Sequence, residues 1–330
     1  MMNVLITGGT GFIGSRLSLR CLDLGYRVRI YGQENTPAEK KNRNDLEASG
    51  ADIILGSMTE ADKIAAAMDG IDVVFHLAAA QHEANVPDSV FWDVNVTGTQ
   101  TILSVAAQKG IRRFVHGSTI GVYGSSLDGI MDEESPLKPD NIYGITKRAG
   151  EESVLSVKDQ QPVVVIRISE TYGPGDQRLL KLFKGIQKRA FFMIGSGNNI
   201  HHLIYIEDLV DGLLAAAQND DALGEIFVLS GKEPLTTNEM VHTIAQVLNK
   251  KKLPVKVPLF PFLMVAVGME AALRPLGIQP PLHRRRMDFF KKSYLFSMDK
   301  SQTKLGFIPK YSFQEGAVKT AEWYKEMNCL

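Results

Sequence analysis

Short runs of apolar residues alternate along the first half of the chain with longer stretches in which apolar positions recur at helical spacing. A run without polar residues predicts a strand buried on both faces, whereas recurrence every three to four positions predicts an amphipathic helix. Strands that alternate with helices form a parallel sheet covered by helices on both faces. The predicted strands are 4–6, 28–31, 52–55, 73–77, 114–117 and 163–166, and the predicted helices include 17–25, 64–68, 90–108 and 143–157.

The alternation loosens after about Ser169. A capping box, in which Thr236 stands three residues before Glu239, predicts the start of a helix that reaches Leu248. Six prolines between positions 254 and 281 favour short elements in the tail. We also predict a loop at 172–177, helices at 179–189 and 208–217, and strands at 203–206 and 225–229.

Composition narrows the class of protein. With 330 residues the chain can form one large or two moderate domains, and its 37 basic residues balance 37 acidic ones, so no net charge favours nucleic acid. The two cysteines, Cys21 and Cys329, are too few for a disulfide framework and indicate a reducing compartment. The longest apolar stretch, 258–273, falls short of the ~20 residues that span a bilayer. We therefore expect a cytoplasmic protein with a small-molecule substrate, no nucleic-acid partner and no membrane span.

Three glycines separate the first predicted strand from the first predicted helix. Gly8, Gly11 and Gly14 follow one another at intervals of three, with Phe12 and Ile13 between the last two. This spacing in a strand–turn–helix context is typical of dinucleotide binding, because the backbone can approach a pyrophosphate and the helix N-terminus attracts it. We therefore expect an α/β protein with a doubly wound parallel sheet, or Rossmann fold. The predicted division is a dinucleotide-binding domain over 1–170, to which 200–230 return, and a smaller C-terminal substrate-binding domain mainly over 171–330.

Tyr143 and Lys147 stand one helical turn apart, on the same face of a predicted helix. An ammonium near a phenol favours the phenolate, so a group with a pKa near ~10 can become a usable base. Upstream, a predicted strand ends in Ser118 and Thr119. Their hydroxyls are expected at the carboxyl edge of the sheet, where ligands of such sheets bind. These four residues are the catalytic candidates.

The glycine turn, the hydroxyls at the end of a strand and the tyrosine–lysine pair together resemble the short-chain dehydrogenase/reductase superfamily. Within it they resemble the extended branch, the NAD-dependent epimerase/dehydratase family. The resemblance covers almost the whole chain, because further motifs follow in that family's order. These motifs are Phe75-His76-Leu77-Ala78-Ala79, Asn95-Val96-Thr97-Gly98-Thr99, Tyr172-Gly173-Pro174-Gly175-Asp176, Ile204-Tyr205-Ile206-Glu207-Asp208 and Leu305-Gly306-Phe307-Ile308-Pro309.

The resemblance implies hydride transfer between a secondary alcohol carbon and a nicotinamide. In this chemistry Tyr143 is the general acid/base, and Lys147 lowers its pKa and holds the nicotinamide ribose. Thr119 hydrogen-bonds the substrate oxygen, with Ser118 as a second hydroxyl or a neighbour of the cofactor. The further cofactor contacts that it implies are Leu77, Ala78, Ala79, Asn95, Ile168 and Ser169.

The resemblance also implies oligomerisation. The helices at 90–108 and 143–157 would pair with their symmetry mates as a four-helix bundle. We therefore expect a homodimer.

The sequence departs from the family pattern where the second strand ends. Gly32 and Gln33 stand where the family usually has an acid that binds the adenosine ribose. The carboxylate that selects NAD is therefore missing, unless Glu34 reaches the ribose. Ser57 replaces an aspartate that often meets the adenine. No basic residue directly adjoins this position, although several are near in sequence, so the expected cofactor is NAD or NADP. The nearby basic residues are Arg29, Lys40, Lys41 and Arg43.

A second departure concerns the substrate. His201, next to His202, occupies the position of an arginine that grips the diphosphate in sugar-nucleotide epimerases. Histidine can replace it only when protonated, and it lacks the planar fork. Arg286, in the basic run 283–286, is a candidate replacement. No metal is expected at the histidine pair, because no further ligands accompany it.

Two functions fit these motifs. The first, which is the expected function because it is frequent in the family, is an epimerase of nucleotide sugars; it predicts retained cofactor and no net redox change. The second is a dehydrogenase or reductase of an apolar alcohol or ketone, similar in its tail to 3-beta-hydroxysteroid-dehydrogenase-like members. The segment 259–273 favours the second, since it predicts a helix apolar all round that is buried, packed on a partner or lining a substrate cleft. Ile120 and Gly121 replace the acid pair of the dehydratases, so a dehydratase is rejected. A non-catalytic cofactor-sensing protein is a remote third alternative.

Overall fold

The computed structural model describes the chain except for residues 82–85, 126–128, 251–254, 274–277 and 279–283 and the side chains of 284–286. Its centre is a seven-stranded parallel sheet with the order β11-β6-β5-β4-β1-β2-β3. This topology confirms the predicted doubly wound α/β fold. The strands are β1 (Asn3–Thr7), β2 (Arg27–Gly32), β3 (Asp52–Leu55), β4 (Val73–His76), β5 (Arg113–Thr119), β6 (Val163–Ile168) and β11 (Ile226–Leu229).

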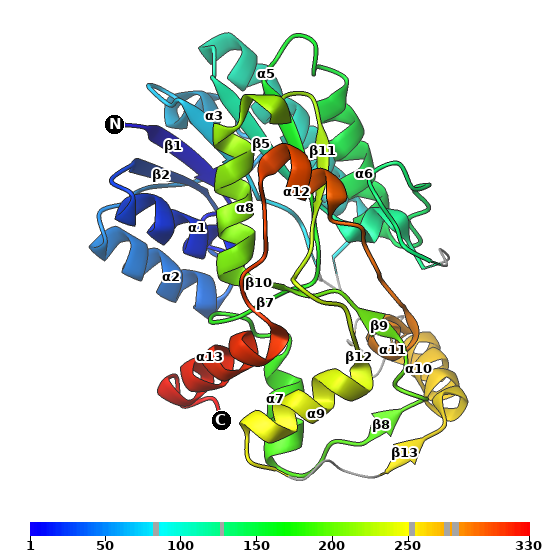
Figure 1. Cartoon of the computed structure of the whole chain (residues 1–330). Coiled ribbons are helices and arrows are strands. Elements are labelled where there is room, and N and C mark those ends of the chain that lie inside the picture. Colours follow the sequence, from blue (N-terminus) through cyan, green and yellow to red (C-terminus); the bar gives the residue numbers. More distant parts are fainter. Residues whose placement is uncertain (82–85, 126–128, 251–254, 274–277, 279–283) are drawn as a thin grey trace.

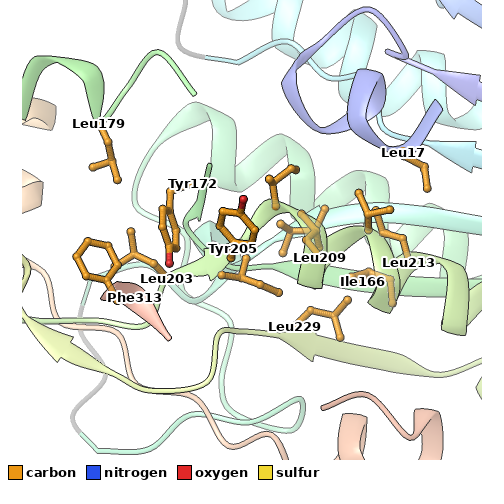
Figure 2. Close-up of a cluster of buried hydrophobic side chains, with 14 of the residues drawn as sticks. Leu17, Ile166, Tyr172, Leu179, Leu203, Tyr205, Leu209, Leu213, Leu229 and Phe313 are labelled. Atoms are coloured by element: carbon orange, nitrogen blue, oxygen red, sulfur yellow. The ribbon is translucent and has the colours of Figure 1, made fainter. Parts of the chain in front are cut away.

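Different helices cover the two faces of the sheet (Figure 1). Successive residues of a strand point to opposite faces, so Val4 and Ile6 of β1 belong to one core and Leu5 to the other. Figure 2 shows Leu17, Leu209 and Leu213 in the first core. The helices α1 (Phe12–Asp23), α2 (Pro37–Ala48) and α8 (Ile206–Gln218) pack on the first face, and α3 (Ala61–Ala67), α5 (Gly98–Lys109) and α6 (Ile142–Leu155) pack on the second.

The helix predicted over 90–108 is interrupted. The structure has α4 (Asp88–Trp92), then a π-helical turn (Asp93–Thr97), and only then α5. The apolar periodicity gave no sign of this turn, which contains Asn95. Single π turns occur frequently at functional sites.

After β6 the chain forms short elements below the carboxyl edge of the sheet (Figure 1). Tyr172 packs against Tyr205 and Phe313 with ring centroids 5.6 and 5.1 Å apart, as Figure 2 shows. The predicted capping box is confirmed, because Thr236 and Glu239 bond each other's backbone. The elements are β7 (Thr171–Tyr172), α7 (Leu180–Gln187), β8 (Met193–Ile194), β9 (Ile200–His201), β10 (Ile204–Tyr205), β12 (Leu235–Thr236), α9 (Thr237–Val247), β13 (Lys256–Val257), α10 (Leu259–Leu273), α11 (Arg284–Lys291) and α13 (Phe313–Glu326). The helix α12 (Asp299–Leu305) lies instead beside α8 and β11 at the sheet (Figure 1).

Later elements rejoin the sheet, since α8 lies on it, β11 pairs with β6 at its edge and α12 packs against β11. The assignment of residues 200–230 to the first domain stays a prediction. The division of the chain into two domains near residue 170 stays a prediction.

The apolar segment forms α10, as predicted. Of the three placements expected of this helix, burial is wrong for this side of it, because Phe260, Met264 and Val265 are 71, 54 and 52% exposed. Among the residues that the structure describes, no helix has both the length and the apolar character needed to cross a bilayer.

Candidate functional site

The predicted cofactor turn joins β1 to α1 at the carboxyl edge of the sheet. Gly8 has a φ of 68°, in the left-handed region that favours glycine. A Cβ on Gly14 would lie 2.3 Å from the carbonyl oxygen of Gly8, so a larger residue would push α1 away from the strand. Gly11 is the N-cap of α1 and has no side chain to cover the amides of Phe12 and Ile13. A pyrophosphate fits this cradle, which offers a close backbone approach and a helix N-terminus.

The ends of β4, β5 and β6 meet beside this turn. A Cβ on Gly117 would lie 2.7 Å from Leu77 Cδ2 and 3.3 Å from Ile168 Cδ1, so these two cofactor candidates close over β5. Ser169, just after β6, donates its hydroxyl to the carbonyl oxygen of His202. Its side chain therefore fastens the strand end to the following segment.

Asn95 ties the loop after β4 to α6. Its Oδ1 accepts from the Ala80 amide at 2.8 Å, and its Nδ2 donates to Thr146 Oγ1 at 3.0 Å. Ala78 and Ala79, which precede the anchored residue, stay partly exposed at the sheet edge. Asn95 thus holds this loop in place from within the π turn.

Tyr143 and Thr119 lie on either side of Gly121. Tyr143 is in the first turn of α6, whose N-cap Asn141 accepts from the Gly144 amide at 3.0 Å. Thr119 ends β5, and its hydroxyl oxygen accepts from the Gly121 amide at 3.1 Å. A Cβ on Gly121 would lie 3.4 Å from Thr119 Oγ1 and 4.0 Å from Tyr143 Cδ1. The structure therefore brings these two candidates to the same point of the sheet edge.

Lys147 lies one turn further along α6 and is buried. Its Nζ donates to the carbonyl oxygen of Gly117 at 2.7 Å. Burial lowers the pKa of Lys147 to about 8, although the attraction of Glu151 acts in the opposite direction. An ammonium has three donors, so hydrogen bonds to ribose hydroxyls are compatible with the one to Gly117.

A buried charge network extends beyond Lys147. Glu151 accepts from Ser118 Oγ at 2.7 Å and from Arg167 Nη2 at 2.6 Å. Arg167 also donates to the Tyr123 hydroxyl at 2.9 Å. Ser118 is therefore engaged in this network, whereas Thr119 lies beside Tyr143.

The sequence motifs do not indicate Glu151 and Arg167. Two signals could have found them. Glu151 stands four residues after Lys147 on the same helix face, and Arg167 is a charge inside the apolar run of β6.

The candidates for anion binding are placed differently from one another. His201 is 2% exposed; its Nδ1 lies 2.8 Å from Glu170 Oε2 and its Nε2 lies 3.1 Å from Thr237 Oγ1. Both ring nitrogens are thus engaged within the protein. Arg286 belongs to α11, but its side chain lies outside the described part of the structure.

An open cleft of about 560 Å³ lies beyond the ends of β2 and β3, where the adenosine end of a dinucleotide on this turn would reach. Glu34 lines it, and its Oε2 is 2.8 Å from Arg43 Nε. Arg43 also lines the cleft, so the ion pair stands in the cleft wall. The cleft therefore offers both a carboxylate and a cation to the ribose. It is lined by Gln33, Glu34, Asn35, Lys40, Arg43, Leu55, Gly56, Ser57 and Glu60.

A sequence profile of the NAD dependent epimerase/dehydratase family matches residues 4–230, more than half of the chain. The chain belongs to this family. It is therefore an enzyme of the extended short-chain dehydrogenase/reductase type that works with a nicotinamide dinucleotide. The matched region includes the glycine turn, Thr119, Tyr143 and Lys147.

Three similar proteins show the range of the epimerase/dehydratase family. A 3beta-hydroxysteroid-dehydrogenase/decarboxylase of Arabidopsis thaliana is 25% identical over 98% of this chain, which spans 62% of the length of that relative. A 3 beta-hydroxysteroid dehydrogenase/Delta 5→4-isomerase of Mycobacterium tuberculosis is 28% identical, with 97% and 90% covered. The solved structure of a dTDP-glucose 4,6-dehydratase from Streptomyces venezuelae with NAD bound is 26% identical, with a TM-score of 0.81 and 98% and 97% covered.

The adenosine cleft leads to a prediction about the choice between NAD and NADP in this family member. Glu34 can accept from a ribose 2′-hydroxyl and repels a 2′-phosphate, so the chain should bind NAD more tightly than NADP. Glu34→Gln removes the repulsion and frees Arg43, and we expect the NAD-to-NADP affinity ratio to fall by roughly tenfold or more. Isothermal titration with each dinucleotide measures both affinities directly.

Glu47→Gln is the matched control, because Glu47 also approaches Arg43, at 3.6 Å, but does not line the cleft. It should leave the ratio unchanged. An unaltered ratio in Glu34→Gln would show that Glu34 does not select the cofactor.

Proposed function

We propose that the chain is a dehydrogenase or reductase of an apolar secondary alcohol or ketone. The observation that carries this proposal is the state of His201, which stands where sugar-nucleotide epimerases have a diphosphate-binding arginine. Its ring is buried and both nitrogens are engaged by Glu170 and Thr237. A substrate without a diphosphate fits such a position better than a nucleotide sugar.

The surroundings of His201 support the same choice. The Phe289 ring of α11 lies against the imidazole, with centroids 4.8 Å apart, and Phe290 packs on Phe289 at 5.0 Å. These aromatic groups stand beside β9, in the part of the chain that would cover a substrate. Two of the similar proteins named above are hydroxysteroid dehydrogenases, which accords with an apolar substrate.

The proposed mechanism assigns proton movement to the side chains at the sheet edge. The bound nicotinamide accepts a hydride in oxidation and supplies one in reduction. Tyr143 takes the hydroxyl proton of the alcohol and returns it in the reverse direction. Thr119 donates its hydroxyl hydrogen to the same substrate oxygen, while its own oxygen accepts from Gly121. Lys147 favours the phenolate of Tyr143 and would hold the nicotinamide ribose.

The second candidate is an epimerase of nucleotide sugars. It is favoured by the similarity over 98% of the chain to a solved nucleotide-sugar enzyme with NAD bound. In this alternative Arg286, rather than His201, would meet the diphosphate. The two functions differ in redox outcome, which makes them separable by one assay.

The assay follows nicotinamide absorbance while the purified protein is offered apolar ketones and alcohols, including sterols, and UDP- and dTDP-sugars. We expect a stoichiometric absorbance change with an apolar substrate, together with a higher melting temperature in its presence. Conversion of a nucleotide sugar into its epimer, without net absorbance change, would overturn the proposal in favour of the second candidate.

We also infer that the protein is a cytoplasmic homodimer that pairs through α5 and α6. These helices pack side by side on one face of the sheet, as Figure 1 shows. Trp92 and Ile145 support the inference, because they are 43 and 41% exposed on α4 and α6, close to the expected interface.

A further inference from the structure

One side of α10 presents a continuous apolar face to solvent. At about 100° per residue, the exposed positions of the helix fall within a single arc of about 160°. Glu270, the one charged residue of α10, lies on the other arc and is 5% exposed. A surface helix of a soluble protein ordinarily carries polar residues on its outer face. The exposed positions are Phe260, Pro261, Met264, Val265, Val267, Gly268, Ala271 and Ala272.

The inner arc of α10 is firmly packed. Ala266 is buried in a small core with Ile194 of β8 and Met287 of α11, and Phe262 and Leu263 pack against it. The Phe262 ring also lies 5.6 Å from that of Phe192. The packing of its inner side on β8 and α11 therefore holds α10 in place, with its outer face exposed.

Exposed apolar side chains are concentrated around this helix. Contiguous apolar surface of this kind marks an interaction site rather than ordinary surface. The large apolar side chains of this region that are at least 38% exposed are Phe192, Val255, Phe260, Met264, Val265, Val267 and Ile278. We call this set, with the outer face of α10, the apolar patch.

A basic segment adjoins the apolar patch. α11 packs on α10, and Figure 1 shows the two helices next to each other. The sequence of 284–292 carries three arginines, two lysines and one acid, Asp288. Lys291 is exposed, whereas Lys292 pairs with Asp140 and Asp288. The described structure therefore places the exposed Lys291 and the backbone of α11 beside the apolar helix, and the sequence of α11 adds three arginines.

We propose that the apolar patch lies in the interface of a membrane that contains anionic lipids. A helix whose exposed face is wholly apolar is stabilised by insertion at the boundary between headgroups and acyl chains, without spanning. Cationic residues next to it bind the anionic headgroups, and two such signals together give stable attachment. The charge beside the patch favours a lipid surface over a second copy of the chain, because two copies that meet face to face would bring their basic segments together.

Hydrogen bonds and an ion pair connect the segment next to the apolar patch, α11 and Lys292, to the elements that carry the catalytic candidates. Asn199, which precedes β9, donates to the carbonyl oxygens of Phe289 and Lys292 at 2.8 and 3.1 Å. Lys292 Nζ lies 2.9 Å from Asp140, which precedes the N-cap of the helix that carries Tyr143. This extension rests on the proposed function: an apolar substrate would leave the bilayer next to the helix pair that leads to the site.

The test is co-sedimentation of the full-length protein with vesicles. We expect little binding to phosphatidylcholine alone and clear binding when phosphatidylserine is included, reduced by high salt. The triple variant Phe260→Ser, Met264→Ser and Val265→Ser should lower the bound fraction about tenfold. The double variant Ile130→Ser and Ile308→Ser removes side chains that are 67 and 69% exposed outside the patch, and it should bind like the original protein.

Three outcomes would overturn the proposal: no binding to anionic vesicles, equal binding by the triple variant, or a sedimentation coefficient that the triple variant lowers from an oligomer to a smaller species. The last would show that a second copy covers the patch, since the expected dimer uses α5 and α6. Turnover of a water-soluble substrate without vesicles should be unchanged in the triple variant. Vesicle binding without turnover of any apolar substrate would refute the proposed function while supporting the membrane site.

Discussion

Replacement of Tyr143 by phenylalanine should lower turnover by roughly three orders of magnitude and leave the binding of NAD unchanged. General acid–base catalysis by a positioned group contributes about 10²–10⁴ in rate, and the phenol is the group proposed to exchange the substrate proton. Removal of one oxygen from the first turn of α6 leaves the N-cap at Asn141 and the packing of Gly144 on Gly121 intact. Steady-state kinetics and titration with NAD separate the two effects.

A matched phenol far from the site serves as the control. Tyr26 accepts a hydrogen bond from Gln218 at 3.0 Å on the opposite side of the sheet from α6. Tyr26→Phe should keep full turnover. Near-normal turnover in Tyr143→Phe would refute the assignment of Tyr143 as the acid/base, whichever substrate is used.

The parallel sheet could be predicted because its strands carry uninterrupted apolar runs. In β1, Val4, Leu5 and Ile6 are all fully buried, and burial on both faces is what removes polar residues from a strand. α2 escaped prediction for the opposite reason. Leu46 is its single buried residue, so no apolar periodicity exists to be read. Its start carries two local signals, the capping box of Thr36 and Glu39 and the proline at position 37.

The catalytic pair could be predicted because its members lie one helical turn apart, a spacing that the sequence displays directly. Glu151 and Arg167 could not be paired in this way, because the bond between α6 and β6 depends on how the helix lies on the sheet. The same limit applies to Glu34 and Arg43. Their ion pair depends on where α2 places Arg43, and no local pattern contains that information.

The substrate stayed open at the level of sequence because His201 has two opposite meanings. An exposed, protonated histidine would replace the arginine of the epimerases, whereas a buried one stabilises the fold. Burial against Glu170 and Thr237 favours the second role, and this burial depends on the pairing of the short strands β9 and β12. The role of α10 likewise depends on its exposure in the structure, because an apolar sequence does not indicate whether the helix is buried or exposed.

Replacement of Lys147 by methionine should abolish most turnover and, at neutral pH, stabilise the protein without cofactor. Lys147 is 2% exposed, and burial lowers its pKa from 10.5 to about 8. Below pH 8, Lys147 is protonated in both the folded and the unfolded chain. The folded chain therefore carries the full free-energy cost of burying this charge, about 3 kcal/mol. Loss of the hydrogen bond to Gly117 offsets about 1 kcal/mol, which leaves a net gain of about 2 kcal/mol.

The pH dependence identifies the cause of this gain. Between pH 8 and 10.5 the folded chain loses the Lys147 proton while the unfolded chain keeps it, so the stability of the lysine protein rises with pH. Methionine has no such titration, and its advantage should therefore shrink across this range. The measurement is the free energy of unfolding by urea of the lysine and methionine proteins at pH 7 and pH 10. Both proteins also carry Tyr143→Phe, so titration of the neighbouring phenol does not contribute. A methionine variant that is less stable at pH 7, or a difference that is equal at both pH values, would mean that burial of the ammonium is not destabilising. The lysine would then be retained without the conflict between stability and activity that the structure implies.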